Sequence, residues 1–155
     1  MVLATKRPWH LWVIGIIATI WNAGGAYDYT MTQTRNMDYL SMGAERAGVP
    51  VEVMLDYYTN FPAWADALWA FGVWGALAGS LLLLFRSRFA FHAFVVALLG
   101  LAGTTVYTLS EDLPAELSTP TMWLFSAAIW ISIILLAWYS RRMTAAGVLR
   151  SAQAG

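Results

Sequence analysis

The sequence contains no cysteine and little charge: 12% of its 155 residues are charged, and only two are histidines. Without cysteine the chain can form no disulfide, thiolate nucleophile, iron–sulfur cluster or cysteine-ligated zinc site. The sequence also lacks a nucleophile–base pair, a cluster of metal ligands and a phosphate-binding loop. We therefore expect a protein that is not an enzyme and that has no cofactor, no metal site and no nucleic-acid partner.

Apolar residues are abundant instead. Hydrophobic residues make up 59% of the chain, nine residues are tryptophan, and the mean hydropathy is +0.58. This composition lies outside the usual range of soluble domains and indicates an integral membrane protein. Because the length suffices for one compact bundle, we expect a single membrane domain over residues 1–155.

The stretch 61–88 contains the clearest membrane span. Pro62 suits the first turn of a helix, and residues 63–84 follow with Asp66 as their only charge. A helix of about 20 apolar residues crosses a bilayer. The same reasoning predicts an all-α, integral membrane four-helix bundle with spans at about 9–29, 63–85, 89–109 and 120–140. A cleavable signal peptide is the alternative for the first run, whose length favours a retained span.

The outer loop 30–62 is too long for a turn and is expected to carry one or two short amphipathic helices. One face of the helix that starts at Pro50 carries Val51, Met54, Leu55 and Tyr58. A second helix is predicted from 36 to 47, ending at Gly48. A helix between two spans most often lies in the membrane interface or caps the bundle, and a ligand lid is the alternative.

The basic residues predict the orientation, because lysine and arginine mark the cytoplasmic side of a membrane protein. Seven of the nine bases fall in the N-terminal segment, the second turn and the tail: Lys6, Arg7, Arg86, Arg88, Arg141, Arg142 and Arg150. Both termini are therefore expected in the cytoplasm.

The acidic residues show the opposite bias. All nine fall on or near the outer face, where Arg35 and Arg46 are the only bases. Such a surface attracts cations or basic protein patches, and more weakly as salt rises. The candidate outer docking surface consists of Glu111, Asp112 and Glu116. The alternative is that these acids only solvate the loops.

Two histidines could in principle bind a haem iron or a metal. His10 and His92 are both predicted at cytoplasmic ends of spans, at comparable depth if the third helix packs beside the first. Imidazoles on neighbouring helices can act as ligands, although interfacial histidines usually do not.

Small residues line the second span. The candidate helix-packing face consists of Gly72, Gly75, Ala76 and Gly79. Small residues let helix backbones approach closely inside a membrane, where the hydrophobic effect does not drive association. Packing within the chain's own bundle is the preferred interpretation over a dimer interface.

A family resemblance rests on four segments: 21–35 (WNAGGAYDYTMTQTR), 61–64 (FPAW), 68–75 (LWAFGVWG) and 86–88 (RSR). These segments resemble a group of small, largely uncharacterised four-span inner-membrane proteins of proteobacteria, often labelled sugar transporters. The resemblance implies a multi-pass protein of a bacterial inner membrane. Its most family-like polar residues gather toward the outer ends of the first two spans and form the candidate polar cluster: Asn22, Asp28, Gln33, Arg35 and Asp66.

Two functions follow from these features. The first is a structural or accessory subunit of a larger membrane complex, favoured by the small size, the glycine-lined faces, the acidic outer surface and the lack of buried charge. The second is a small-solute, sugar-type transporter that works as a homo-oligomer, because four spans rarely enclose a pathway alone. The expected partners are the lipid bilayer and either other membrane-protein subunits or further copies of the chain.

Overall fold

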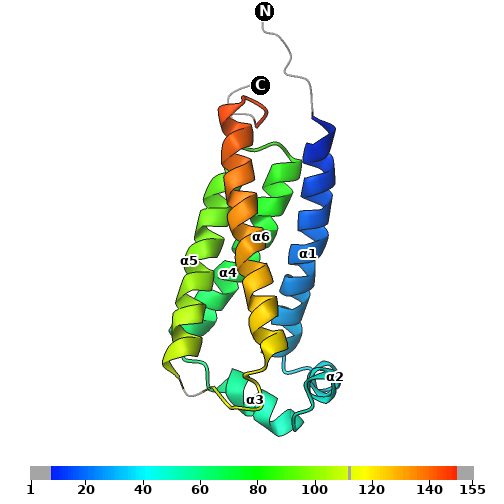
Figure 1. The fold of residues 1–155 in the computed structure, drawn as a ribbon, viewed down its shortest axis with the longest axis vertical. Helices are drawn as coiled ribbons and strands as arrows, with labels where there is room; N and C mark the ends of the chain where they lie inside the picture. Colours follow the sequence, from blue (N-terminus) through cyan, green and yellow to red (C-terminus); the bar gives the residue numbers. More distant parts are fainter. Residues whose placement is uncertain (1–7, 112, 150–155) are drawn as a thin grey trace, which may run out of the picture.

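A computed structural model describes residues 8–111 and 113–149. Its helices, in order, are α1 (Trp9–Gln33), α2 (Met37–Ala47), α3 (Val51–Thr59), α4 (Ala63–Leu84), α5 (Ala90–Ser110) and α6 (Pro120–Ala145) (Figure 1). All the regular elements in the described ranges are helical, so the predicted all-α class is confirmed. Lys6, Arg7, Asp112 and Arg150, which entered the sequence predictions, lie outside the described residues.

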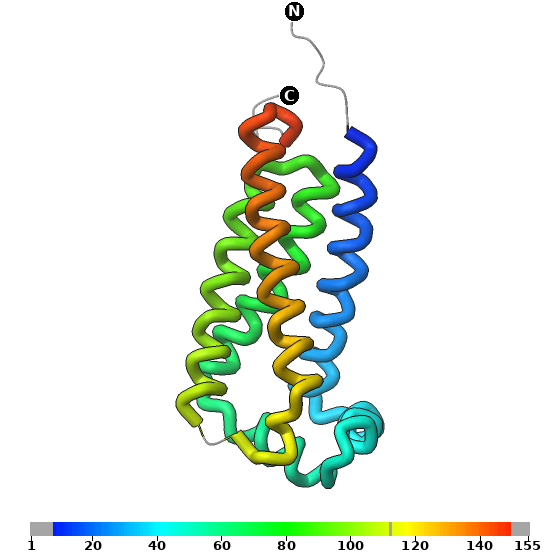
Figure 2. Tube along the Cα trace, viewed as in Figure 1, coloured from blue at the N-terminus to red at the C-terminus, as the bar shows by residue number. Residues whose placement is uncertain are grey.

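The four long helices lie side by side and alternate in direction (Figure 2). Their main contacts run in the order α1, α4, α5, α6, because α4 packs against both α1 and α5, and α5 packs also against α6. The short helices α2 and α3 lie across one end of this row, which we call the loop end. The opposite end carries Trp9, the α4–α5 turn and Ala145, and we call it the Trp9 end.

Three of the helices, α4, α5 and α6, are long and apolar enough to cross a membrane. Large hydrophobic side chains such as Leu99, Leu124 and Ile131 are exposed on the bundle, as expected for a surface in contact with lipid. Helix α1 has 25 residues, but it is not among the three. A lipid bilayer is therefore the environment of the bundle, and α1 as a fourth span stays a prediction.

Glycine allows α4 and α5 to approach very closely. A Cβ atom on Gly100 would lie 2.4 Å from the backbone nitrogen of Gly72, and one on Gly75 would lie 3.1 Å from that of Ala97. Neither position has room for a larger side chain without movement of a backbone. The predicted helix-packing face lies inside the chain's own bundle, at Gly72, Gly75, Ala76 and Gly79.

The residues after α6 close the Trp9 end. Val148 and Leu149 are buried in the main hydrophobic core together with Leu11 and Leu83. The guanidinium group of Arg86 donates two hydrogen bonds to the carbonyl oxygen of Val148, at 2.8 and 3.1 Å. The α4–α5 turn is thereby tied to the segment that follows α6.

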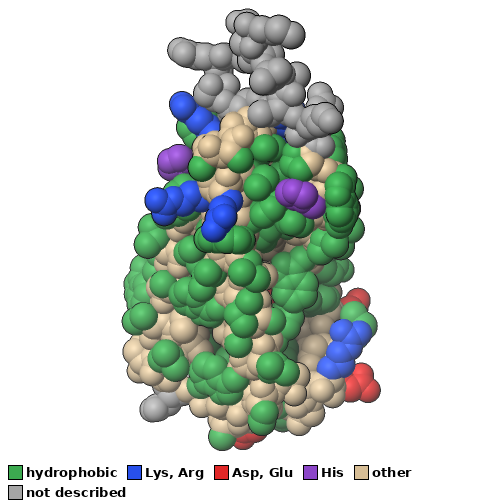
Figure 3. All heavy atoms as spheres, turned by 45° about the horizontal axis from the view of Figure 1, so that its top comes forward, with side chains coloured by type: hydrophobic (Ala, Val, Ile, Leu, Met, Phe, Trp, Pro, Cys, Tyr) green, Lys and Arg blue, Asp and Glu red, His purple; other side chains and the backbone are tan. Residues whose placement is uncertain are grey.

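Charge is separated along the bundle. Every acidic residue that the structure describes lies at the loop end, on α2, α3, the loop-end turns of α1 and α4, or the α5–α6 connection. The bases Arg86, Arg88, Arg141 and Arg142 lie at the Trp9 end. Figure 3 shows basic and histidine side chains near that end and hydrophobic side chains over much of the visible body.

Candidate functional site

Two adjoining pockets open at the loop end. The first, the Asp66 pocket, holds about 410 Å³ of empty space, counting space open to solvent, and is lined by Thr32, Gln33, Arg35, Leu40, Leu55, Tyr58, Thr59 and Asp66. The second, the Asp28 pocket, holds about 490 Å³ on the same basis and is lined by Asp28, Thr32, Tyr39, Leu40, Met42, Gly43, Arg46, Met54 and Tyr58. Because Thr32, Leu40 and Tyr58 line both, the pockets share a wall.

A reversal of the chain after α1 places Arg35 at the Asp66 pocket. Arg35 has a left-handed backbone conformation with a φ of 51°. In this turn the N–H groups of Arg35 and Asn36 donate to the carbonyl oxygens of Thr32 and Met31, both at 3.0 Å. Glycine usually occupies such a position, because a Cβ atom makes it strained. The side chain of Asn36 then accepts a hydrogen bond from the N–H of Tyr39, and α2 begins at once.

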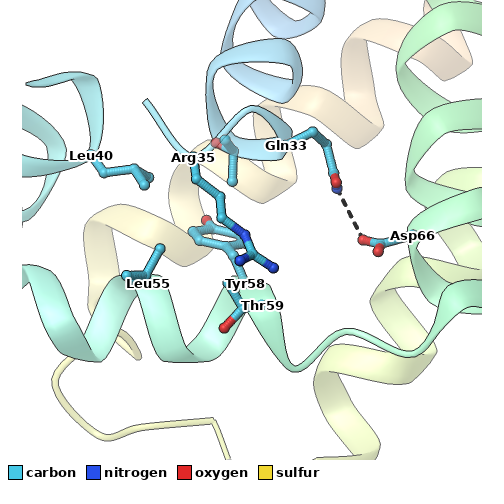
Figure 4. Close-up of a pocket in the computed structure, with 8 residues that line it drawn as sticks. Gln33, Arg35, Leu40, Leu55, Tyr58, Thr59 and Asp66 are labelled. Carbon is cyan, nitrogen blue, oxygen red and sulfur yellow. Dashed lines mark hydrogen bonds between the residues drawn. The ribbon is translucent and has the colours of Figure 1, made fainter. Parts of the chain in front are cut away.

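One side-chain hydrogen bond joins the end of α1 to the start of α4 in the Asp66 pocket. Gln33 Nε2 donates to Asp66 Oδ1 at 3.0 Å. Figure 4 shows these two side chains facing each other, while the Arg35 side chain extends toward Tyr58 and Thr59. Within the described part of the chain, the guanidinium of Arg35 has no hydrogen bond and no ion pair. The pocket therefore carries one cation and one anion that are not paired with each other.

The Asp28 pocket also combines an acid with a base. Tyr39 Oη donates a hydrogen bond to Asp28 Oδ1 at 2.7 Å, which connects α2 to α1. Burial is the largest cause, and the bond to Asp28 the next, of a rise in the pKa of Tyr39 to about 12. The positive charge of Arg46 opposes this rise, as expected from a cation in the same pocket.

Aromatic contacts fix the wall that the two pockets share. The Tyr58 ring stacks on the Trp69 ring of α4, with centroids 5.4 Å apart and planes at 22°. Two residues beyond α3, Phe61 packs edge-on against Tyr107 of α5 at 4.8 Å. Burial raises the pKa of Tyr58 above its ordinary value, so this wall presents a neutral phenol. These contacts hold α3 against the α4–α5 hairpin.

The structure brings together four members of the candidate polar cluster. Gln33, Arg35 and Asp66 line one pocket and Asp28 lines the other. Asn22 lies apart from them, buried between α1 and α4, where its Nδ2 donates to Ser80 Oγ at 2.8 Å. A helix rises about 1.5 Å per residue, so Asn22 and Gln33 are separated by about 16 Å along α1.

The two histidines have different surroundings. His10 Nδ1 is hydrogen-bonded to the hydroxyl of Tyr139 on α6 at 2.5 Å, whereas the His92 ring lies beside Phe89 and Phe91. Helix α5 has α4 and α6 as its main neighbours, so α1 and α5 are not the packed pair that a bis-histidine site requires. Within residues 8–111 and 113–149, no three His, Asp or Glu side chains are grouped so that they could hold a metal ion.

The candidate docking surface is described only in part. Glu111 follows α5 directly and Glu116 lies in the connection to α6, and both side chains are exposed at the loop end. Asp112 lies outside the described residues. The docking role of this surface stays a prediction.

Several pocket residues were not singled out from the sequence: Thr32, Tyr39, Arg46 and Thr59. The sequence did indicate the wall that α3 forms, because Met54, Leu55 and Tyr58 were expected on one face of a helix. All three line a pocket. That face packs against α2 and, through Tyr58, against Trp69 of α4.

Comparison with known proteins finds no matching family model, no similar curated sequence and no similar solved structure. The family resemblance of the sequence therefore stays a prediction. The function is inferred from the geometry of the two pockets and of the bundle.

Proposed function

We propose that the protein is a small-solute transporter of a bacterial inner membrane, which works as a homo-oligomer and takes up its solute at the loop end. In this arrangement α1 is the fourth span, the Trp9 end faces the cytoplasm and the loop end faces outward. The positive-inside rule supports this orientation, since the bases of the α4–α5 turn and of the end of α6 lie at the Trp9 end.

The observation that carries the proposal is the pair of polar pockets. Their walls combine acidic, basic, amide and hydroxyl groups with two tyrosine rings, and a few convergent polar groups in a concave site are typical of small-molecule recognition. Two short helices, α2 and α3, cover this end of the bundle. In this proposal α2 and α3 act as a ligand lid, which is the alternative role that the sequence offered for them.

The seam between α1 and α4 leads inward from the pockets. Small or polar residues are buried on these two helices, namely Ala18, Asn22, Ala26, Ala76 and Ser80, and toward the Trp9 end Leu11 and Leu83 are buried as well. The hydrogen bond between Asn22 and Ser80 lies along this seam and joins two polar side chains inside the bundle. Four helices rarely enclose a transport pathway on their own. In this proposal, further copies of the chain form the rest of its wall.

Uptake by reconstituted protein tests the proposal. The purified chain is placed in liposomes, and entry of labelled sugars and amino acids is compared with that into protein-free liposomes. We expect uptake of at least one solute class, and its loss in Asp66→Asn, which keeps the size of the side chain but removes its charge. Asp38→Asn, which changes an exposed acid of α2 outside both pockets, is the matched control. Entry of every solute at the same rate as into protein-free liposomes would contradict transport.

A second candidate, an accessory subunit of a larger membrane complex, is supported by the burial of α6. Only 17% of the most apolar 18-residue stretch of α6 is buried inside the chain, compared with 28% for the corresponding stretch of α4. Helix α6 therefore offers much apolar surface to another membrane protein. Purification in a mild detergent from the native membrane separates the two: stoichiometric foreign subunits support this second candidate, and a pure homo-oligomer supports the transporter.

A further inference from the structure

We propose that the Asp66 pocket binds a small zwitterion, whose carboxylate pairs with Arg35 and whose ammonium group pairs with Asp66. This inference rests on the proposed function, because it names the solute class of the same site. The Asp66 pocket carries one positive and one negative side chain, so it matches a ligand that carries both charges and has no net charge.

The first step is that the two charges are available. In the described part of the chain, Arg35 has no partner, and the only hydrogen bond of the Asp66 carboxylate comes from the uncharged amide of Gln33. A guanidinium fork binds a carboxylate with two parallel hydrogen bonds. Asp66 retains its second oxygen, Oδ2, as a free acceptor for an ammonium group.

The second step is selectivity. A simple anion would pair with Arg35 but would be repelled by Asp66, and a simple cation would meet the reverse arrangement. A neutral sugar would leave both charges without a counter-charge. A zwitterion satisfies both groups at once, which makes the combination of Arg35 with Asp66 a discriminating one.

The third step is the backbone at Arg35. A left-handed conformation is strained for an arginine, because its Cβ atom crowds the backbone, and it is not strained for glycine. In the described part of the chain the exposed Arg35 side chain makes no hydrogen bond and no ion pair, so no such interaction offsets the strain of this turn. A ligand that pairs with the guanidinium group supplies one.

The fourth step is the apolar part of the pocket. Leu40, Leu55 and Tyr58 line the side of the pocket that lies toward α2 and α3 (Figure 4). These side chains fit the carbon skeleton of the ligand, while the charged ends face Arg35 and Asp66. A free amino acid has this combination of a short apolar part with adjacent carboxylate and ammonium groups.

Binding of four probes to the full chain in detergent tests the inference by calorimetry. The probes are L-alanine, which carries both charges, propionate, which carries only the negative one, propylamine, which carries only the positive one, and glucose, which carries none. We expect alanine to bind at least about tenfold more tightly than the other three, because propionate and propylamine each lose one charge-assisted pair and glucose loses both.

Variants then assign the two charges. Arg35→Gln should weaken alanine binding about tenfold, with Arg35→Lys between it and the native chain, because lysine keeps the charge but not the fork. Asp66→Asn should weaken alanine binding similarly and narrow the preference for alanine over propionate. Arg88→Gln at the Trp9 end and Asp38→Asn on α2 are the matched controls and should leave binding unchanged.

Other outcomes would overturn the inference. Binding of glucose alone, or equal binding of propionate and alanine, would exclude the zwitterion while leaving a solute site in place. Failure of all four probes to bind the native chain would overturn the zwitterion, while the uptake measurement in liposomes decides the proposed function separately. The preference of the native chain for alanine over the other three probes tests the zwitterion even if a variant does not fold.

Discussion

Asn22 of α1 donates a hydrogen bond from Nδ2 to Ser80 Oγ of α4 at 2.8 Å, and both side chains are buried. We expect Ser80→Ala to destabilise the bundle by about 0.5–2 kcal/mol, because the amide of Asn22 then lacks a partner away from water. Unfolding in a detergent titration measures this change. Ser132→Ala is the control, since Ser132 donates only to a carbonyl of its own helix. An equal effect of both substitutions would contradict the interhelical role.

Gly100 and Gly24 give a matched pair for the packing of α4 and α5. A Cβ atom on Gly100 would meet the backbone of Gly72 at 2.4 Å, whereas one on Gly24 would meet nothing within 4 Å. We expect Gly100→Ala to cost about 1–3 kcal/mol through overpacking, and Gly24→Ala to be neutral or slightly stabilising, because alanine favours a helix. Thermal unfolding followed by circular dichroism compares the two. Similar stability of both variants would contradict the close contact.

Arg35 and Arg86 occupy equivalent left-handed turns after α1 and α4, with φ of 51° and 58°. The Arg86 side chain donates hydrogen bonds to Val148, whereas the Arg35 side chain makes none within the described residues. Arg35→Gly should stabilise the chain by about 1 kcal/mol through relief of strain, while weakening alanine binding about tenfold, as in Arg35→Gln. Arg86→Gly should destabilise it, because the relief is outweighed by lost hydrogen bonds to the segment after α6. Unfolding curves for both variants check this difference in sign.

The bond between Tyr39 and Asp28 predicts a change in stability at high pH. The pKa of Tyr39 is raised from 10.0 to about 12, so the neutral phenol is favoured in the folded chain. Its contribution to stability is complete below about pH 10 and is lost as the pH rises through about 12. Ultraviolet titration of tyrosinate follows the ionisation, and Tyr39→Phe identifies the signal. In Asp28→Asn the pKa of Tyr39 should fall part of the way back, because burial, the largest cause, remains.

Single cysteines test the proposed orientation in a chain that has no cysteine of its own. Thr5→Cys, Glu45→Cys and Arg141→Cys place thiols before α1, on α2 and at the end of α6. With an impermeant thiol reagent on intact cells, we expect labelling at position 45 alone. Labelling at position 5 would show that α1 does not cross the membrane in the proposed sense.

The helical class and the membrane environment could be predicted because both follow from local sequence. Long apolar runs between polar connections suffice for α4, α5 and α6. The end of α1 was harder, since the helix continues to Gln33 beyond the expected boundary near 29. It stops at a left-handed Arg35, and a position of that kind is normally signalled by glycine, as at Gly48.

The site could be predicted only in part for a related reason. Asp28, Gln33 and Asp66 are brought together because the alternating helices return to the same end of the bundle. Asn22 lies on the same face of α1 as Gln33, but helical rise carries it about three turns away from the pockets. The position of Tyr58 depends on its stacking with Trp69, a contact between separate helices that no local pattern in the sequence specifies.

The order of the long helices also determines how the chain would leave the membrane under tension. α1 and α6 are the edges of the row, and each has one long helix as its main neighbour, whereas α4 and α5 are joined by a short turn and packed on both sides. A pull on the N-terminus therefore loads the edge helix α1 before the α4–α5 hairpin. A pull on the C-terminus instead loads the hairpin at once, through the hydrogen bonds between Arg86 and Val148.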